Sequence, residues 1–135
     1  MRRSLLAVPL LLAALAAGCT SGASSTSDFE GEEKQVADQV EKLETAGKST
    51  DAKAICTEIL AKSFSEEIDR AGSTCEDEVD KAIKDADDYD LEVEDVTISG
   101  DTATAKVKGS VGDEDAVRDF EFVREGKDWR ATKLG

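Results

Sequence analysis

The stretch Thr102-Ala103-Thr104-Ala105-Lys106-Val107-Lys108-Gly109-Ser110-Val111 alternates small or apolar residues with polar ones along its whole length. A period of two is typical of a β-strand that turns one face to a core and the other to water. Turn-forming residues flank the stretch, with Ser99-Gly100-Asp101 before it and Gly112-Asp113-Glu114-Asp115 after it. The stretch therefore predicts a strand that short turns join to a neighbour on each side.

The residues before this strand predict another one. Leu91 and Val93 alternate with acidic residues, and Val96 and Ile98 alternate with polar ones. The phase of the alternation slips at Glu94-Asp95, which indicates a bulge or a bend at that point.

The residues after it predict two more strands. Phe120 and Phe122 share one face of the first, while Val117 and Val123 share the other. The turn 125–128 then leads into a last strand over 129–134. Four strands joined by short turns predict an antiparallel meander, and its apolar face needs a cover.

Helices precede the sheet and supply this cover. We expect a first helix over 32–46 that ends at Gly47. A second helical segment begins after residue 51, breaks near 63–65 and ends near 72. A third helix begins at about Thr74. Ser63 with Glu66, and Ser73 with Glu76, each fit a capping box. The inward positions of the three are Val36, Val40 and Leu43, then Ile55, Cys56, Ile59, Leu60 and Phe64, then Val79, Ala82, Ile83 and Ala86. The fold class is therefore α+β, with N-terminal helices packed on a four-stranded, curved antiparallel meander sheet.

The N-terminus has the pattern of an export signal. Met1-Arg2-Arg3 is followed by an apolar run of 13 residues, 5–17, which is shorter than the ~20 needed to cross a bilayer. The run ends in Leu15-Ala16-Ala17-Gly18-Cys19, which resembles the lipobox of bacterial lipoproteins. This resemblance implies a signal peptide over 1–18 and diacylation of Cys19. An ordinary signal peptide is the alternative, and Arg2-Arg3 leaves twin-arginine export open beside general secretion.

Residues 19–31 then form a lipidated cysteine and a flexible Ser/Thr/Gly tether, and the folded domain spans 32–135. Two acyl chains hold a protein at a membrane lastingly. We therefore expect a location at the extracytoplasmic face of the cell membrane.

The charge and composition exclude several functions. The chain has 31 acidic and 17 basic side chains, a formal charge of −14, and no histidine. The acidic excess argues against nucleic-acid binding, which depends on Lys and Arg. Without histidine there is no imidazole base and no serine–histidine triad. No cofactor motif is present either, since the sequence has no glycine-rich phosphate loop.

Cys56 and Cys75 are predicted to form a disulfide, because exported chains are oxidised. A redox-active pair is the alternative, but the Cys-x-x-Cys spacing is absent. The acidic run around Asp85, Asp87, Asp88 and Asp90 offers oxygen ligands for Ca²⁺, although its spacing does not fit an EF-hand, and a solvated face is the simpler interpretation.

The domain resembles the nuclear-transport-factor-2-like superfamily, and in particular its small actinobacterial-type lipoproteins of unknown function. The residues that carry the resemblance are Phe120-x-Phe122-Val123-x-x-x-Gly126-Lys127-x-Trp129-Arg130 and the turn 96–103, and it covers about 32–135. It implies a cone of helices and bent sheet whose mouth binds a small apolar ligand. The aromatic side chains then either fill a core or line a pocket, and the candidate lining residues are Phe64, Phe120, Phe122 and Trp129.

We therefore expect a lipid-anchored, extracytoplasmic, non-catalytic module that binds a protein partner or a small ligand at the cell envelope. The acidic surface favours a basic partner. The alternatives are an apolar-ligand carrier with a cone cavity and an enzyme of the same fold.

The first prediction concerns Cys19. Replacing Cys19 by Ser should release the protein from membranes, because it removes the sulfur that carries the acyl chains. Detergent phase separation of cells expressing either form measures this. Equal membrane partitioning of the variant and the wild type would contradict lipidation.

Overall fold

The computed structural model describes residues 26–86, 89–111 and 114–135, and within them four strands form one antiparallel sheet. The strands are β1 (Leu91–Ser99), β2 (Thr102–Val111), β3 (Glu114–Glu125) and β4 (Asp128–Leu134), paired in the order β1-β2-β3-β4. Gly100 and Gly126 take positive φ values of 60° and 64° in the turns before β2 and β4. The predicted meander is confirmed. Residues 112 and 113 of the predicted turn before β3, and all of 1–25 with Cys19, lie outside the described residues.

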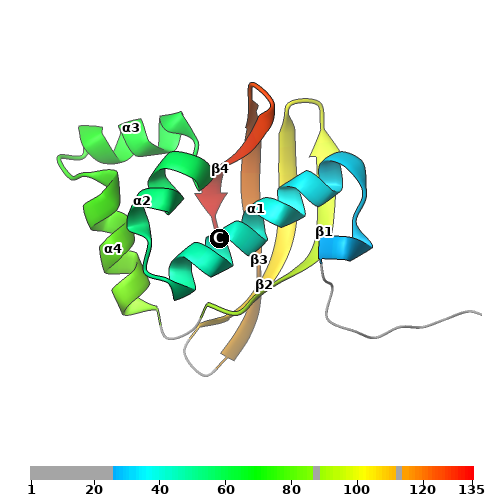
Figure 1. Ribbon diagram of the computed structural model, residues 1–135, viewed down its shortest axis with the longest axis horizontal. Coiled ribbons are helices and arrows are strands. Elements are labelled where there is room, and N and C mark those ends of the chain that lie inside the picture. The colour runs from blue at the N-terminus through cyan, green and yellow to red at the C-terminus, as the bar shows by residue number, and fades with distance from the viewer. Residues whose placement is uncertain (1–25, 87–88, 112–113) are drawn as a thin grey trace, which may run out of the picture.

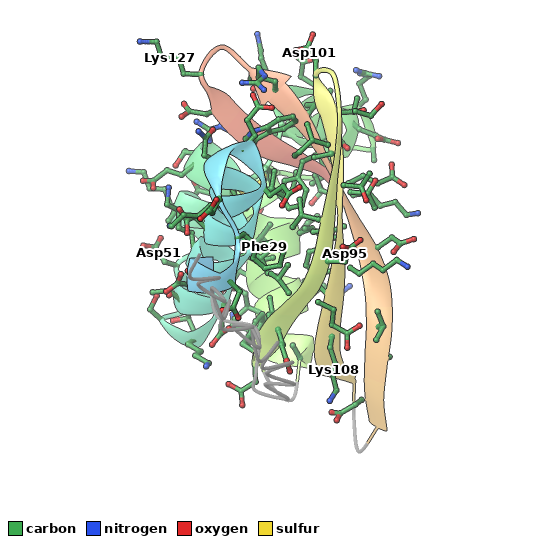
Figure 2. All side chains as sticks on the ribbon, turned by 90° about the vertical axis from the view of Figure 1, so that its right-hand side faces the viewer. Phe29, Asp51, Asp95, Asp101, Lys108 and Lys127 are labelled. Atoms are coloured by element: carbon green, nitrogen blue, oxygen red, sulfur yellow. A yellow bond between two sulfur atoms is a disulfide. The ribbon has the colours of Figure 1, made fainter. Side chains whose placement is uncertain are left out.

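The helices lie on one face of this sheet and beyond its β4 side (Figures 1 and 2). They are the 3₁₀ helix η1 (Thr26–Asp28), α1 (Gly31–Lys48), α2 (Ala52–Ala54), the π-helical turn η2 (Ile55–Ile59), α3 (Lys62–Arg70) and α4 (Cys75–Asp85). α1 crosses the sheet, whereas α3 and α4 lie together beyond its β4 side (Figure 1). The fold is therefore α+β, as the sequence predicts. No described helix has the length and apolar character of a membrane span.

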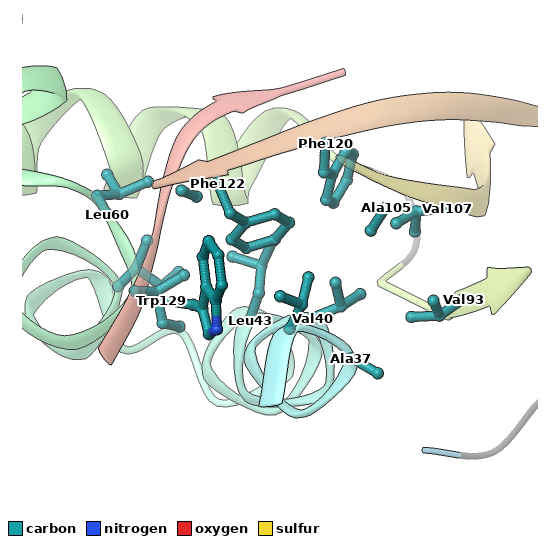
Figure 3. Packing of buried hydrophobic residues seen from close by; sticks show 14 of the residues in the cluster. Ala37, Val40, Leu43, Leu60, Val93, Ala105, Val107, Phe120, Phe122 and Trp129 are labelled. Carbon is teal, nitrogen blue, oxygen red and sulfur yellow. The ribbon is translucent and has the colours of Figure 1, made fainter. Parts of the chain in front are cut away.

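The core lies between α1 and the sheet (Figure 3). Ala103 and Ala105 of β2 pair with Phe122 and Phe120 of β3, so a small residue stands beside each ring. Phe122 pairs with Ala131 of β4 on its other side. The small cross-strand neighbours leave room for the two rings on the inner face of the sheet, where both are buried.

Two irregularities bend the sheet. The register of β1 against β2 shifts between Val93 and Asp95, where the sequence shows the slip, and this shift leaves both Val93 and Val96 buried. A second shift separates Glu121 and Phe122 on the β3–β4 pair. Because a bulge bends its strand and increases the local twist, these two positions help to curve the sheet around the helices.

The helix boundaries differ from the prediction at two places. Gly47 does not end α1, which continues to Lys48, and Thr50 takes the left-handed conformation there with φ 55°. The second helical segment breaks at 60–61 instead of 63–65. There the Ala61 N–H donates to the Ala131 carbonyl at 2.8 Å, and the Lys62 N–H donates to Glu125 Oε1 at 2.9 Å. Contacts with β3 and β4 therefore set this break, and no local signal in the sequence encodes them.

The two predicted capping boxes are not used as predicted. α3 begins after Ala61 without a side-chain cap, and α4 begins after Thr74, whose Oγ1 accepts from the Asp77 N–H at 3.2 Å. Asp51, in contrast, caps α2 by accepting from the Ala54 N–H at 3.0 Å. Each side chain that caps lies directly before its helix, as the physics of N-caps requires.

Cys56 and Cys75 form a disulfide with 6.1 Å between their Cα atoms. It joins η2 to the first residue of α4 and closes the loop that contains α3. The sequence separation is 19 residues, for which the chain-entropy model gives about 3 kcal/mol of stabilisation.

The second prediction concerns this bond. Reduction, or the double substitution of Cys56 and Cys75 by Ser, should lower the free energy of unfolding by about 3 kcal/mol. Thermal denaturation monitored by circular dichroism measures the effect, and the reductant should leave the double variant unchanged. Fast alkylation of both thiols in the native, unreduced protein would show that the bond is absent.

Candidate ligand-binding cavity

A cavity of about 590 Å³ lies between the α3–α4 pair and the concave face of the sheet. Helices contribute one wall and strands the other, and most of the lining side chains are apolar. The lining residues are Leu43, Ile55, Leu60, Phe64, Ile68, Glu78, Val79, Ala82, Ile83, Ala86, Tyr89, Leu91, Val107, Gly109, Ala116, Arg118, Phe120 and Leu134. This volume is within the ~300–1,000 Å³ of typical small-molecule sites.

The helical wall comes from one face of α4. Val79, Ala82, Ile83 and Ala86 are spaced by three or four residues, so they lie on one side of the helix. The sequence predicts that these four face inward. All four line the cavity, and Ile83 is buried and Val79 half-buried, but Ala82 and Ala86 are exposed and lie at its open side. The Cys56–Cys75 disulfide ties the first residue of α4 to η2, so this wall has a covalent attachment to the rest of the domain.

The strand wall leaves room through small residues. Gly109 pairs with Leu91 of β1 and with Ala116 of β3. A Cβ atom at Gly109 would lie 3.1 Å from Leu91 Cδ2, so any larger residue would crowd this wall. Small side chains at these positions keep the space between sheet and α4 open.

Tyr89 closes one end of the cavity against α1. Its ring packs on Gly47, where a Cβ would lie 2.6 Å from Cε1 and 2.9 Å from Cγ of the ring. The Tyr89 hydroxyl donates to the Ala82 carbonyl at 3.4 Å. Burial raises the pKa of the Tyr89 phenol above its ordinary value. Gly47 is therefore needed for close contact with a ring and not for ending the helix.

A lysine holds the segment that carries Tyr89. The Lys48 ammonium donates to Asp90 Oδ1 at 2.6 Å and to Glu44 Oε1 at 2.5 Å. Glu44 Oε2 also accepts from the Leu91 N–H at 3.2 Å. The hydrogen bonds to Asp90 and Glu44 raise the pKa of Lys48. These contacts fix the start of β1 to the end of α1.

Among the lining residues that the structure describes, Glu78 and Arg118 carry a full charge, one on α4 and the other on β3. Arg118 is in phase with Ala116 and Phe120, which also line the cavity, and it pairs with the buried Val107. Both charged side chains are exposed, so their ends reach solvent. No ion pair forms between them in the described structure.

The aromatic residues proposed as pocket lining are divided between two places. Phe64 and Phe120 line the cavity. Phe122 and Trp129 do not. They are 2% and 1% exposed, and they point from the sheet toward α1 in the core (Figure 3). Trp129 lies on β4 where Arg124 covers its ring at 4.6 Å. Phe64 and Phe120 are therefore pocket-lining residues, and Phe122 and Trp129 are core residues.

Sequence reasoning missed Tyr89 and Arg118 as cavity residues. The signal for Arg118 was present, because it continues the alternation of Phe120 and Phe122 toward the N-terminal end of the strand. For Tyr89 no local signal exists, since its position depends on Gly47, distant in sequence.

The cavity offers little for catalysis or for a metal. Within the described part of its lining, the ionisable side chains are Glu78, Tyr89 and Arg118, with no pair of carboxylates and no cysteine. Among the residues that the structure describes, no group of three or more Cys, Asp and Glu side chains could hold a metal ion. Asp87 and Asp88 of the acidic run lie outside those residues.

A second hollow, of about 460 Å³, lies between α1 and the α2–η2 segment and is lined largely by charged and polar side chains.

No protein-family model matches the chain, and no curated protein or solved structure is significantly similar to it.

The third prediction concerns the Gly47–Tyr89 contact. Gly47→Ala should destabilise the domain by about 1–3 kcal/mol, because the new methyl group overlaps the ring. In a Tyr89→Ala background the same change should instead stabilise it by up to ~1 kcal/mol, as Gly→Ala does in an ordinary helix. Urea denaturation of the four proteins measures both values. The same sign in both backgrounds would contradict the packing described here.

Proposed function

We propose that this chain is a non-catalytic binding protein for a small apolar ligand, held at the extracytoplasmic face of the membrane by a lipid on Cys19. The observation that carries the proposal is the cavity of about 590 Å³ with its largely apolar lining. Apolar contact area in such a site favours an apolar occupant by about 0.8 kcal/mol for each CH₂ group removed from water.

The surface favours a small ligand over a protein partner. Among the described residues, Val117 is the one large hydrophobic side chain that is exposed, at 52%. Docking surfaces for proteins usually need a contiguous apolar patch. The apolar surface of this domain is gathered instead in the cavity between α4 and the sheet.

The lining also favours binding over catalysis. The Tyr89 hydroxyl is engaged with the Ala82 carbonyl, and Glu78 and Arg118 are exposed. General acid–base catalysis relies on an ionisable group positioned against the reacting atoms, whereas these two charges lie at the solvent end of the lining.

The proposed location at the envelope rests on the lipobox-like segment that ends at Cys19, and one structural observation supports it. The Cys56–Cys75 disulfide is typical of an oxidising compartment. The acidic surface would be repelled by anionic lipid, so the proposed acyl anchor would supply the attachment. Helices on a curved four-stranded meander, with a cavity between them, also support the proposed place in the nuclear-transport-factor-2-like superfamily.

The fourth prediction tests the cavity with an uncharged probe. N-phenyl-1-naphthylamine should bind the protein saturably with a rise in fluorescence. Ala82→Phe places a ring in the cavity and should weaken this binding at least about tenfold.

Lys81→Phe is the matched control, because it introduces the same side chain at the preceding residue of α4, which lies outside the lining. It should leave the affinity unchanged. Absence of saturable binding to the wild type, or an equal loss in both variants, would overturn the proposed function.

A further inference from the structure

We infer that the ligand is a single-chain amphiphile with an anionic head group, its chain in the cavity and its head group on the Arg118 guanidinium. This inference rests on the proposed function and names the ligand class for the same site. Arg118 is the cationic side chain among the cavity residues.

Arg118 occupies a position that strand geometry assigns to the inner face. Its neighbours at 116 and 120 line the cavity, and its cross-strand partner Val107 is 1% exposed. The stem of Arg118 runs past the backbone of Gly135, where an added Cβ would lie 2.8 Å from Arg118 Cδ. The side chain thus starts on the apolar wall and ends in solvent, which places the guanidinium at the cavity mouth.

The other arginines of the described structure have acidic partners. Arg70 pairs with Glu66 at 3.9 Å, and Arg130 pairs with Asp128 at 3.8 Å. Arg124 pairs with Glu32 and Asp101. Arg118 alone has no ion pair in this part of the molecule, although acidic residues outnumber basic ones 31 to 17 in the chain. Its guanidinium is therefore available for an anion from outside.

Among the described lining residues, Glu78 has the charge that would favour a cationic head group instead. Its charge has a structural explanation, however, because Glu76, Asp77 and Glu78 form the acidic first turn of α4. Carboxylates there interact favourably with the helix N-terminus. No equivalent explanation exists for an arginine on the inner face of β3.

The guanidinium suits a carboxylate or a phosphate monoester. Its planar N–H groups donate two parallel, charge-assisted hydrogen bonds to the oxygens of either group. Burial of the chain supplies affinity, and the head group contact supplies selection between amphiphiles of equal length.

The fifth prediction uses calorimetric titration to separate the contribution of chain burial from that of the head-group contact. The ligands are decanoate, decyl phosphate, decan-1-ol and decylamine, each below the concentration at which it aggregates. The wild type should bind decanoate or decyl phosphate at least about tenfold more tightly than decan-1-ol, and the stronger of the two identifies the head group. Arg118→Gln should remove that preference and leave the affinity for decan-1-ol unchanged.

Arg70→Gln is the control, because it removes an exposed arginine of α3 that does not line the cavity. It should retain the preference for the anion. Equal binding of decan-1-ol and the anions, a preference for decylamine, or an unchanged preference in Arg118→Gln would each overturn this inference while leaving an apolar cavity in place. Failure of all four compounds to bind would overturn the proposed function as well.

Discussion

The position of the α3–α4 pair depends on how the chain passes from η2 into α3. At Leu60 the backbone is extended and bridges in parallel to Ala131, and Ala61 donates to the same β4 residue. The Cys56–Cys75 disulfide is the second attachment, on the other side of α3. Backbone hydrogen bonds fix the start of α3 against the sheet, and the disulfide fixes the start of α4 to η2. The two helices are therefore held at a distance from the concave face, and the cavity is the space left between them.

This space stays open because the chain has little with which to fill it. Aromatic residues make up 4% of the sequence, and the large rings of Phe122 and Trp129 are used in the core under α1. The cavity walls instead carry small residues such as Ala82, Gly109 and Ala116. An unfilled apolar cavity lowers the stability of a domain, because its lining lacks contacts on one side. A disulfide that restricts the unfolded chain offsets part of that loss.

The sequence predicts those features that depend on local pattern. The alternation over 102–111, the slip at Glu94-Asp95 and the shared face of Phe120 and Phe122 all correspond to the observed sheet. Features that depend on tertiary contacts could not be predicted. The break before α3 is set by β4, and Gly47 is required by a ring that follows 42 residues later. The cavity itself falls in this second class, because a pattern shows which residues face inward but not whether their volumes fill the interior. Arg118 belongs partly to each class. The alternation of β3 places it on the inner face, but the sequence does not show that it lacks an acidic partner.

An arginine at the mouth of an apolar cavity acts differently in an acidic protein than in a basic one. The formal charge of −14 repels anions at long range, but at physiological ionic strength this repulsion is screened beyond about 8 Å. A small anion without an apolar chain gains only one exposed contact with Arg118, and such contacts contribute little. An amphiphile gains the same contact together with burial of its chain, and the two contributions act on one molecule. Selectivity therefore comes from the apolar chain, because an anion that offers charge alone gains too little to bind, whereas one whose chain enters the cavity gains both contributions.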